Sequence, residues 1–198
     1  ASYGQYIYSG NAKLKINDDA LATTGSNTLI DLGTTYIKDY FQPGMPQKAA
    51  SFGLEYRAPQ FWWIGANVNY LADSYIDISN VLRTNNFTIN PSGDTYAGAT
   101  PDAVREILKQ EKFADFTLVN LTGGKSWRIS KANRNTVGFF ASINNVFDVR
   151  YKTGGFEQSR KANFPDLQAD NANGTPSFGA KYFYGYGRTA FVNFYINF

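Results

Sequence analysis

Long stretches of this sequence alternate between apolar and polar residues, and this period of two is its strongest constraint on the fold. Between residues 62 and 78, one parity carries Trp62, Ile64, Ala66, Val68, Tyr70, Ala72, Ile76 and Ile78. The other parity is mostly Gly, Asn and Asp. The same alternation runs through residues 3–16, 49–58, 115–129, 137–149 and 190–198. Alternation over such lengths predicts six β-strands, each with one apolar and one polar face.

The lengths of these strands favour a membrane protein over a soluble sandwich. Strands of soluble sheets average about 5–6 residues, whereas a tilted membrane-spanning strand needs roughly 9–11. Short turns are expected at Pro59-Gln60 and at residues 130–135, and long loops at residues 17–48, 79–113 and 151–181. Short turns at one end and long loops at the other are typical of outer-membrane barrels. The sequence therefore predicts an all-β fold, an antiparallel transmembrane β-barrel segment of about six long strands.

Aromatic residues make up 17% of the chain, nearly as much as the charged fraction of 18%. Three rings fall at the short-turn ends of strands with the same apolar parity: Tyr56, Trp62 and Trp127. Amphipathic rings at one depth are typical of the interface between lipid and water. We expect these three residues to form an interfacial girdle.

The sequence contains no histidine and no cysteine. This composition excludes Ser-His and Cys-His nucleophile pairs and any His/Cys zinc or haem site within the chain. No pair of carboxylates stands out for glycosidase-type chemistry. We therefore expect no enzymatic activity, no cofactor and no metal site. The net charge of +3 is scattered along the chain, which argues against a nucleic-acid partner.

The long loops carry the remaining candidates. Thr100-Pro101-Asp102 has the cap, first-turn proline and acid of a helix start, so one short helix is expected in an extracellular loop. Four loop aromatics are candidate ligand-facing residues: Tyr96, Phe156, Phe164 and Phe178. The run Asn144–Asp148 has two interpretations, polar side chains that bond neighbouring backbone or a ligand contact, and we favour the first. Asp18-Asp19 and the run 170–174 lack the spacing of a Ca²⁺ loop.

Six strands are too few to close a membrane barrel, for which known cases begin at about 8. An open sheet would leave unpaired edges in lipid, which is costly for every exposed backbone group. We expect the chain to be a fragment of a larger barrel or to be completed by another polypeptide. The alternative is a complete eight-stranded barrel in which the loop 17–48 supplies two further strands, for instance through residues 30–40.

Specific segments resemble TonB-dependent outer-membrane receptors. Residues 145–151 (NVFDVRY) are similar to the N-L-F-D-x-x-Y stretch near the end of that family, with Val146 in place of the usual Leu. Residues 48–57 (KAASFGLEYR) look like a strand of the same family, and residues 187–198 (GRTAFVNFYINF) resemble its last strand. The runs FWWIGANVNYLADSYIDIS and KYFYGYGRT resemble the large nutrient-importing, SusC-like type.

The resemblance implies a 22-stranded barrel with an internal plug domain, of which residues 1–198 would be the C-terminal part and about the last six strands. The plug domain and the signal peptide would then lie outside this chain. The implied function is active import of a glycan, a peptide or a metal chelate across the bacterial outer membrane. The implied partners are the rest of the barrel with its plug, the TonB complex, the outer-membrane assembly machinery, a surface lipoprotein, and membrane lipid with lipopolysaccharide.

The family's C-terminal Phe is read by the assembly machinery, so the resemblance makes Phe194, Ile196 and Phe198 the candidate assembly signal. Two other function classes remain as alternatives. One is a passive outer-membrane porin or a small structural barrel. The other is a soluble carbohydrate-binding β domain.

Overall fold

The computed structural model describes residues 1–17, 28–129 and 135–198, and most of its regular structure is antiparallel β-sheet. Ten strands form one six-stranded sheet and two two-stranded sheets. The described residues also include two short α-helices and two 3-10 helices. The prediction of an all-β fold is confirmed.

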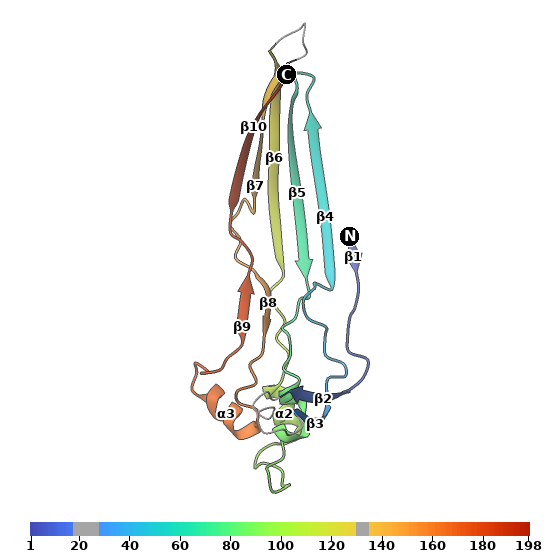
Figure 1. Ribbon diagram of the computed structural model, residues 1–198, viewed down its shortest axis with the longest axis vertical. Coiled ribbons are helices and arrows are strands. Elements are labelled where there is room, and N and C mark those ends of the chain that lie inside the picture. Colours follow the sequence, from blue (N-terminus) through green and yellow to red (C-terminus); the bar gives the residue numbers. More distant parts are fainter. Residues whose placement is uncertain (18–27, 130–134) are drawn as a thin grey trace.

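The six-stranded sheet has the order β1-β4-β5-β6-β7-β10, with every neighbouring pair antiparallel. Five of these strands are long and run side by side in the upper half of Figure 1, with the C terminus at their upper end. The strands are β1 (Ser2–Tyr3), β4 (Lys48–Arg57), β5 (Trp62–Ala72), β6 (Phe116–Arg128), β7 (Thr136–Asn144) and β10 (Thr189–Asn197). Within the described residues this sheet is open, because β1 and β10 are its edges.

The other elements lie beyond the opposite end of the long strands (Figure 1). The hairpin β8 (Lys152–Phe156) and β9 (Lys181–Tyr184) lies nearest to the sheet. We call the remainder the cap: β2 (Ala12–Asn17), β3 (Leu29–Thr35), η1 (Val81–Arg83), η2 (Asn85–Phe87), α2 (Pro101–Ile107) and α3 (Phe164–Ala172). A hydrophobic core holds the cap together: Leu82, Phe87, Leu108, Phe164 and Leu167.

The first of the six predicted strands is wrong as a single element. Ser2–Tyr3 joins the large sheet, whereas Ala12–Asn17 pairs with β3 in the cap. Between them the backbone of Tyr6 and Tyr8 bonds to the segment 40–47, since Tyr6 N donates to Gln47 Oε1 and Tyr8 N to Tyr40 O. The idea that residues 30–40 extend the main sheet is also wrong here, because β3 pairs with β2.

The predicted helix is confirmed, but it is not alone. Thr100 caps α2 and its side-chain oxygen accepts a hydrogen bond from Ala103 N at 3.3 Å. A second helix, α3, begins in the same way, with Asn163 Oδ1 accepting from Asp166 N at 3.0 Å and proline in the first turn. Since α3 lies in a segment expected to be loop, the prediction of one helix is wrong.

Asn145 connects the end of the large sheet to the strand pair β8–β9. It is buried at a φ of 51°, and its side chain bonds Val149 N, Val149 O and Tyr186 O. These bonds hold the segment between β7 and β8 against the segment between β9 and β10. They support the interpretation of residues 144–148 as an element that bonds neighbouring backbone.

The glycine pair in β6 does not interrupt the sheet. Gly123 and Gly124 pair in continuous register with β5 on one side and β7 on the other, without a bulge. Side-chain parity is therefore constant along β6. Among the described helices, none is long and apolar enough to cross a membrane.

Candidate functional site

One face of the large sheet is apolar across all five long strands. Because directly paired residues share a face, the register gives the members of this outer face. They are Phe52 and Leu54 in β4, Ile64, Ala66 and Val68 in β5, Val119, Leu121 and Gly123 in β6, Phe139, Ala141 and Ile143 in β7, and Ala190, Val192 and Phe194 in β10. The opposite, inner face carries mostly small and polar residues: Ser51, Gly53, Glu55, Asn67, Asn69, Asn120, Thr122, Ser126, Ser142, Asn144, Asn193 and Asn197. It also carries large side chains, among them Trp63, Leu118, Phe140, Phe191 and Tyr195.

The outer face has no partner within the described residues. Phe52 is 64% exposed, Leu54 67% and Val192 55%. Ala72 is the one described strand residue of this sheet that belongs to the buried apolar core, which otherwise lies in the cap and the segments that lead to it. An exposed apolar area of this extent marks a surface that contacts lipid or another protein.

The predicted girdle residues lie together at the short-turn end of the outer face. The rings of Tyr56 and Trp62 have centroids 5.4 Å apart, and those of Trp127 and Phe139 are 6.0 Å apart. Trp62 pairs with Lys125, which pairs in turn with Phe139. In the register Tyr56 aligns with Ile64, Trp62 with Lys125 and Trp127 with Val137, so the three rings lie in successive rows at the short-turn end of the outer face.

The candidate assembly residues lie at the same end, Phe194 and Ile196 in the edge strand β10 and Phe198 directly after it. Phe194 is opposite Phe139 and Ile196 is opposite Val137 on the outer face. Their exposed fractions are 77% and 54%, and that of Phe198 is 95%. All three side chains are accessible to a partner.

A second set of rings lies at the loop end of the same face. Tyr70 is 41% exposed, and Tyr3 shares its face through the pairs Tyr3–Lys48 and Lys48–Ala72. From Trp62 to Tyr70 the strand rises roughly 27 Å, at about 3.4 Å per residue. At the tilt of about 35–45° that barrel strands have, this rise covers roughly 20 Å of the apolar band of a membrane barrel, which is about 25 Å tall. The parity of Tyr70 was visible in the sequence, but only the register shows that it faces the same way as Tyr3.

Charges gather just beyond this second set of rings. Asp73 follows β5 and pairs with Lys112 and with Lys48, whose Nζ is 2.7 Å from Asp73 Oδ2. Hydrogen bonds from Lys112 and then from Lys48 lower the pKa of the Asp73 carboxyl below its usual range. The first carboxylate after β5 therefore stays ionised, at the point where the apolar face ends.

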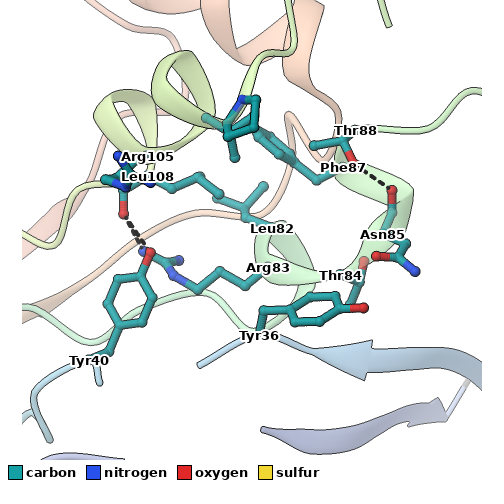
Figure 2. Close-up of a pocket in the computed structure, with 12 residues that line it drawn as sticks. Tyr36, Tyr40, Leu82, Arg83, Thr84, Asn85, Phe87, Thr88, Arg105 and Leu108 are labelled. Atoms are coloured by element: carbon teal, nitrogen blue, oxygen red, sulfur yellow. Dashed lines mark hydrogen bonds between the residues drawn. The ribbon is translucent and has the colours of Figure 1, made fainter. Parts of the chain in front are cut away.

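The cap contains a cavity of about 570 Å³ beside α2 (Figure 2). Arg83 forms one wall and is almost fully buried, with 1% of its side chain exposed. Its Nη1 and Nη2 contact Glu157 at 2.5 and 2.9 Å, and the Tyr40 ring centroid lies 4.5 Å from its Cζ. Arg83 Nη2 and Tyr40 Oη both donate to Leu108 O, at 2.9 and 3.2 Å. Arg83 thus joins η1, the end of β8 and the end of α2, and Glu157 neutralises its charge.

The accessible lining of this cavity is amphipathic. Leu82 and Leu108 give an apolar floor, and half of Tyr36 is exposed at the opening. Arg105 also lines the cavity and pairs with Asp102 at 2.9 Å. A molecule with an apolar face and a few polar groups fits this lining. The described residues contain no group of three or more side chains suited to holding a metal ion.

The four predicted ligand-facing aromatics do not converge on one site. Phe164 is 1% exposed and packs edge-on against Phe87 with ring centroids 6.1 Å apart, so its prediction is wrong: it is a core residue. Tyr96 packs against the same core and is partly buried. Phe156 is 41% exposed and lies 6.0 Å from the ring of Phe183. The Phe178 ring lies under Arg160, 5.2 Å from its Cζ.

Sequence reasoning did not identify the lining of the cap cavity. Tyr36, Arg83 and Arg105 come from three separate segments, and no short-range spacing relates them. Asp18-Asp19 lies outside the described residues, as does most of the predicted turn at 130–135. Compared with known proteins, the chain matches no family model, no curated protein and no solved structure.

Proposed function

We propose that this chain is the C-terminal part of the barrel of a TonB-dependent outer-membrane receptor, which imports a nutrient actively. The observation that carries the membrane part of this proposal is the outer face, apolar on five adjacent strands and bounded by rings at both ends. In this arrangement the outer face contacts lipid, and the inner face of asparagine, serine and threonine lines the lumen.

The positions of the connections agree with this orientation. The β4–β5 turn is short and lies at the end that carries Tyr56 and Trp62, which is the periplasmic side in outer-membrane barrels. The cap is built from the long loops at the other end and would face the outside of the cell. Its cavity is then the first place on this chain where an imported molecule can be held.

The open edges explain why the rest of a barrel is required. Strand β1 pairs only with Lys48 and Ala49 of β4, so the rest of β4 and the outer edge of β10 present unpaired rows of backbone groups in the described sheet. In lipid each such group costs several kcal/mol. Further strands of the same barrel would remove both edges. The NVFDVRY segment and the C-terminal Phe favour a receptor as the source of those strands, through the family resemblance described above.

Arginine substitution on the two faces of one strand tests the membrane part. Ala66 lies on the outer face of β5, midway between Trp62 and Tyr70, and Asn67, the next residue, lies on the inner face. Arginine at the lipid-facing midplane costs about 2–4 kcal/mol, whereas lumen positions tolerate it. We expect Ala66→Arg to reduce the folded protein in the outer-membrane fraction strongly and Asn67→Arg to leave it near wild type. Equal effects, or recovery of the wild-type protein in the soluble fraction, would contradict the proposal.

The receptor part is tested separately. We expect the full-length product of this gene to form a cross-link to TonB in cells. Outer-membrane localisation without any TonB adduct would be consistent with a membrane barrel but would refute the proposal that it is a TonB-dependent receptor.

A further inference from the structure

An apolar hollow of about 430 Å³ lies on the outer face, across β5, β6 and β7. Gly123 and Ala141 are paired neighbours and form its floor. Ile64, Leu121 and Ile143 form walls, and a row of Trp62, Lys125 and Phe139 closes the end toward the short turns.

The hollow is a fixed feature of the strand packing. A Cβ added at Gly123 would lie 3.2 Å from Trp63 O, a tight contact with the backbone of β5. The rows on either side, Leu121–Ile143 and Lys125–Phe139, carry large side chains. The depression therefore stays open between two raised rows.

A positive charge stands at one end of this apolar hollow. The Nζ of Lys125 lies 5.3 Å from the ring centroid of Trp127, and no described carboxylate is within ion-pair distance of it. The other lysine on this face, Lys48, lies at the far end and pairs with Asp73. The hollow thus presents an unpaired cation and an apolar surface together.

We propose that this hollow binds an anionic phospholipid, with one acyl chain over Gly123 and Ala141 and the phosphate on Lys125. The proposal rests on the membrane location proposed above. Trp62 and Trp127 place Lys125 at the depth of lipid headgroups. The hollow lies between the Lys125 and Leu121 rows, which are roughly 14 Å apart along the strand at about 3.4 Å per residue. An acyl chain that starts at the interface crosses this hollow on its way into the bilayer.

The charge determines which lipid is preferred. Each lysine near a membrane surface raises the affinity for an anionic headgroup about fivefold. A zwitterionic lipid with the same acyl chains fills the hollow but gains less from Lys125. A free phosphate ion meets the charge but leaves the apolar floor exposed.

Native mass spectrometry on the full-length protein, extracted from membranes and delipidated, tests the site. Phosphatidylglycerol, phosphatidylcholine of the same acyl chains, and inorganic phosphate are titrated separately. We expect phosphatidylglycerol to bind most tightly. Lys125→Gln should weaken phosphatidylglycerol about fivefold without changing phosphatidylcholine, and Ala141→Leu should weaken both lipids.

Two control variants match these changes. Lys109→Gln removes an exposed cap lysine, and Ala50→Leu enlarges another alanine of the outer face that does not line the hollow. Both should bind lipid as wild type does. Folding of each variant is verified by thermal unfolding. If Ala141→Leu does not fold, the lipid affinities of Lys125→Gln alone test the proposal.

The proposal is overturned if wild type binds the two lipids equally, if inorganic phosphate binds as well as phosphatidylglycerol, or if Lys125→Gln changes nothing. Each of these results can occur in a protein that is recovered from the outer membrane, in which case only the lipid site fails. Absence of the protein from the membrane fraction refutes the proposed function as well.

Discussion

The ring of Tyr195 in β10 covers Gly138, the residue directly opposite it in β7. A Cβ added at Gly138 would lie 2.5 Å from the Cζ of this ring, and the Tyr195 hydroxyl reaches across β7 to within 2.5 Å of Ser126 Oγ in β6. One side chain therefore connects three strands at the edge of the sheet. The absence of a side chain at Gly138 is what allows this contact.

We expect Gly138→Ala to destabilise the protein by about 1–3 kcal/mol, the usual cost of overpacking. The added methyl group would meet both the Tyr195 ring and Lys125 O, at 2.8 Å, and backbone cannot move aside as a side chain can. Gly53→Ala is the matched control, since its closest neighbour is the Asn67 amide nitrogen at 3.3 Å. Chemical unfolding in detergent measures both. Equal stabilities for the two variants would show that the contact does not constrain β10.

Asn145 is the second position where the structure predicts a large effect of substitution on stability. Asn145→Ala leaves Val149 N, Val149 O and Tyr186 O without their partner and puts alanine at a φ of 51°. The three bonds are part-buried. Each contributes a net of about 0.5–1.5 kcal/mol, so we expect a loss of about 2 kcal/mol or more in the free energy of unfolding.

Two variants separate the causes. Asn145→Gly tolerates the positive φ but still lacks the hydrogen bonds, so it should remain destabilised. Asn144→Ala removes one exposed hydrogen bond of 3.4 Å and should change stability little. A near-wild-type Asn145→Gly variant would mean that backbone conformation, rather than the hydrogen bonds, makes asparagine necessary.

Asp170 should make the stability of the cap dependent on pH. The backbone amides of Ser177 and then Phe178 donate to its carboxylate at 2.9 and 3.1 Å, which lowers the pKa of Asp170. A lowered folded pKa gives stability that is present above the unfolded pKa, about 3.9, and is lost as the pH falls through the folded value.

Asp170→Asn should therefore lower the melting temperature at neutral pH, and the difference from wild type should shrink below about pH 4. Hydrogen exchange at Ser177 and Phe178 reports the same contact locally. Asp166→Asn is the control, because Asp166 lies in the same helix and bonds the exposed Asn163 side chain. A pH-independent difference would contradict an ionised Asp170.

The long strands could be predicted because their information is local. Alternation at Trp62, Ile64 and Val68 specifies both a strand and its apolar face, and the register adds only which strands are neighbours. The same pattern failed at Tyr6 and Tyr8. There, the choice between extending a sheet and bonding to the segment 40–47 depends on where a distant loop passes.

The cap could not be predicted for the same physical reason. Phe164 and Phe178 both occur in a Gly- and Asn-rich stretch, yet one is in the core and the other is half-buried beneath Arg160. Their environments are determined by contacts between loops, such as Phe87 with Phe164, that have no periodic signature. The capping signal at Asn163-Phe164-Pro165-Asp166 is local and marks the start of α3, although this segment was expected to be loop.

The C-terminal residue should matter for assembly and not for stability. Phe198 is 95% exposed and forms no ring contact with any described aromatic residue, so Phe198→Ala should leave the melting temperature of the folded protein unchanged. If Phe198 is part of an assembly signal, as its resemblance to the family's last strand implies, the same change should reduce the folded fraction in the outer membrane several-fold.

Tyr186→Ala is the matched control, because Tyr186 is 86% exposed but lies away from the C terminus. Heat-modifiable mobility in gels of the outer-membrane fraction measures assembly, and thermal unfolding of the purified protein measures stability. An unchanged folded fraction for Phe198→Ala, or an equal decrease for both variants, would exclude a specific role of the terminal ring.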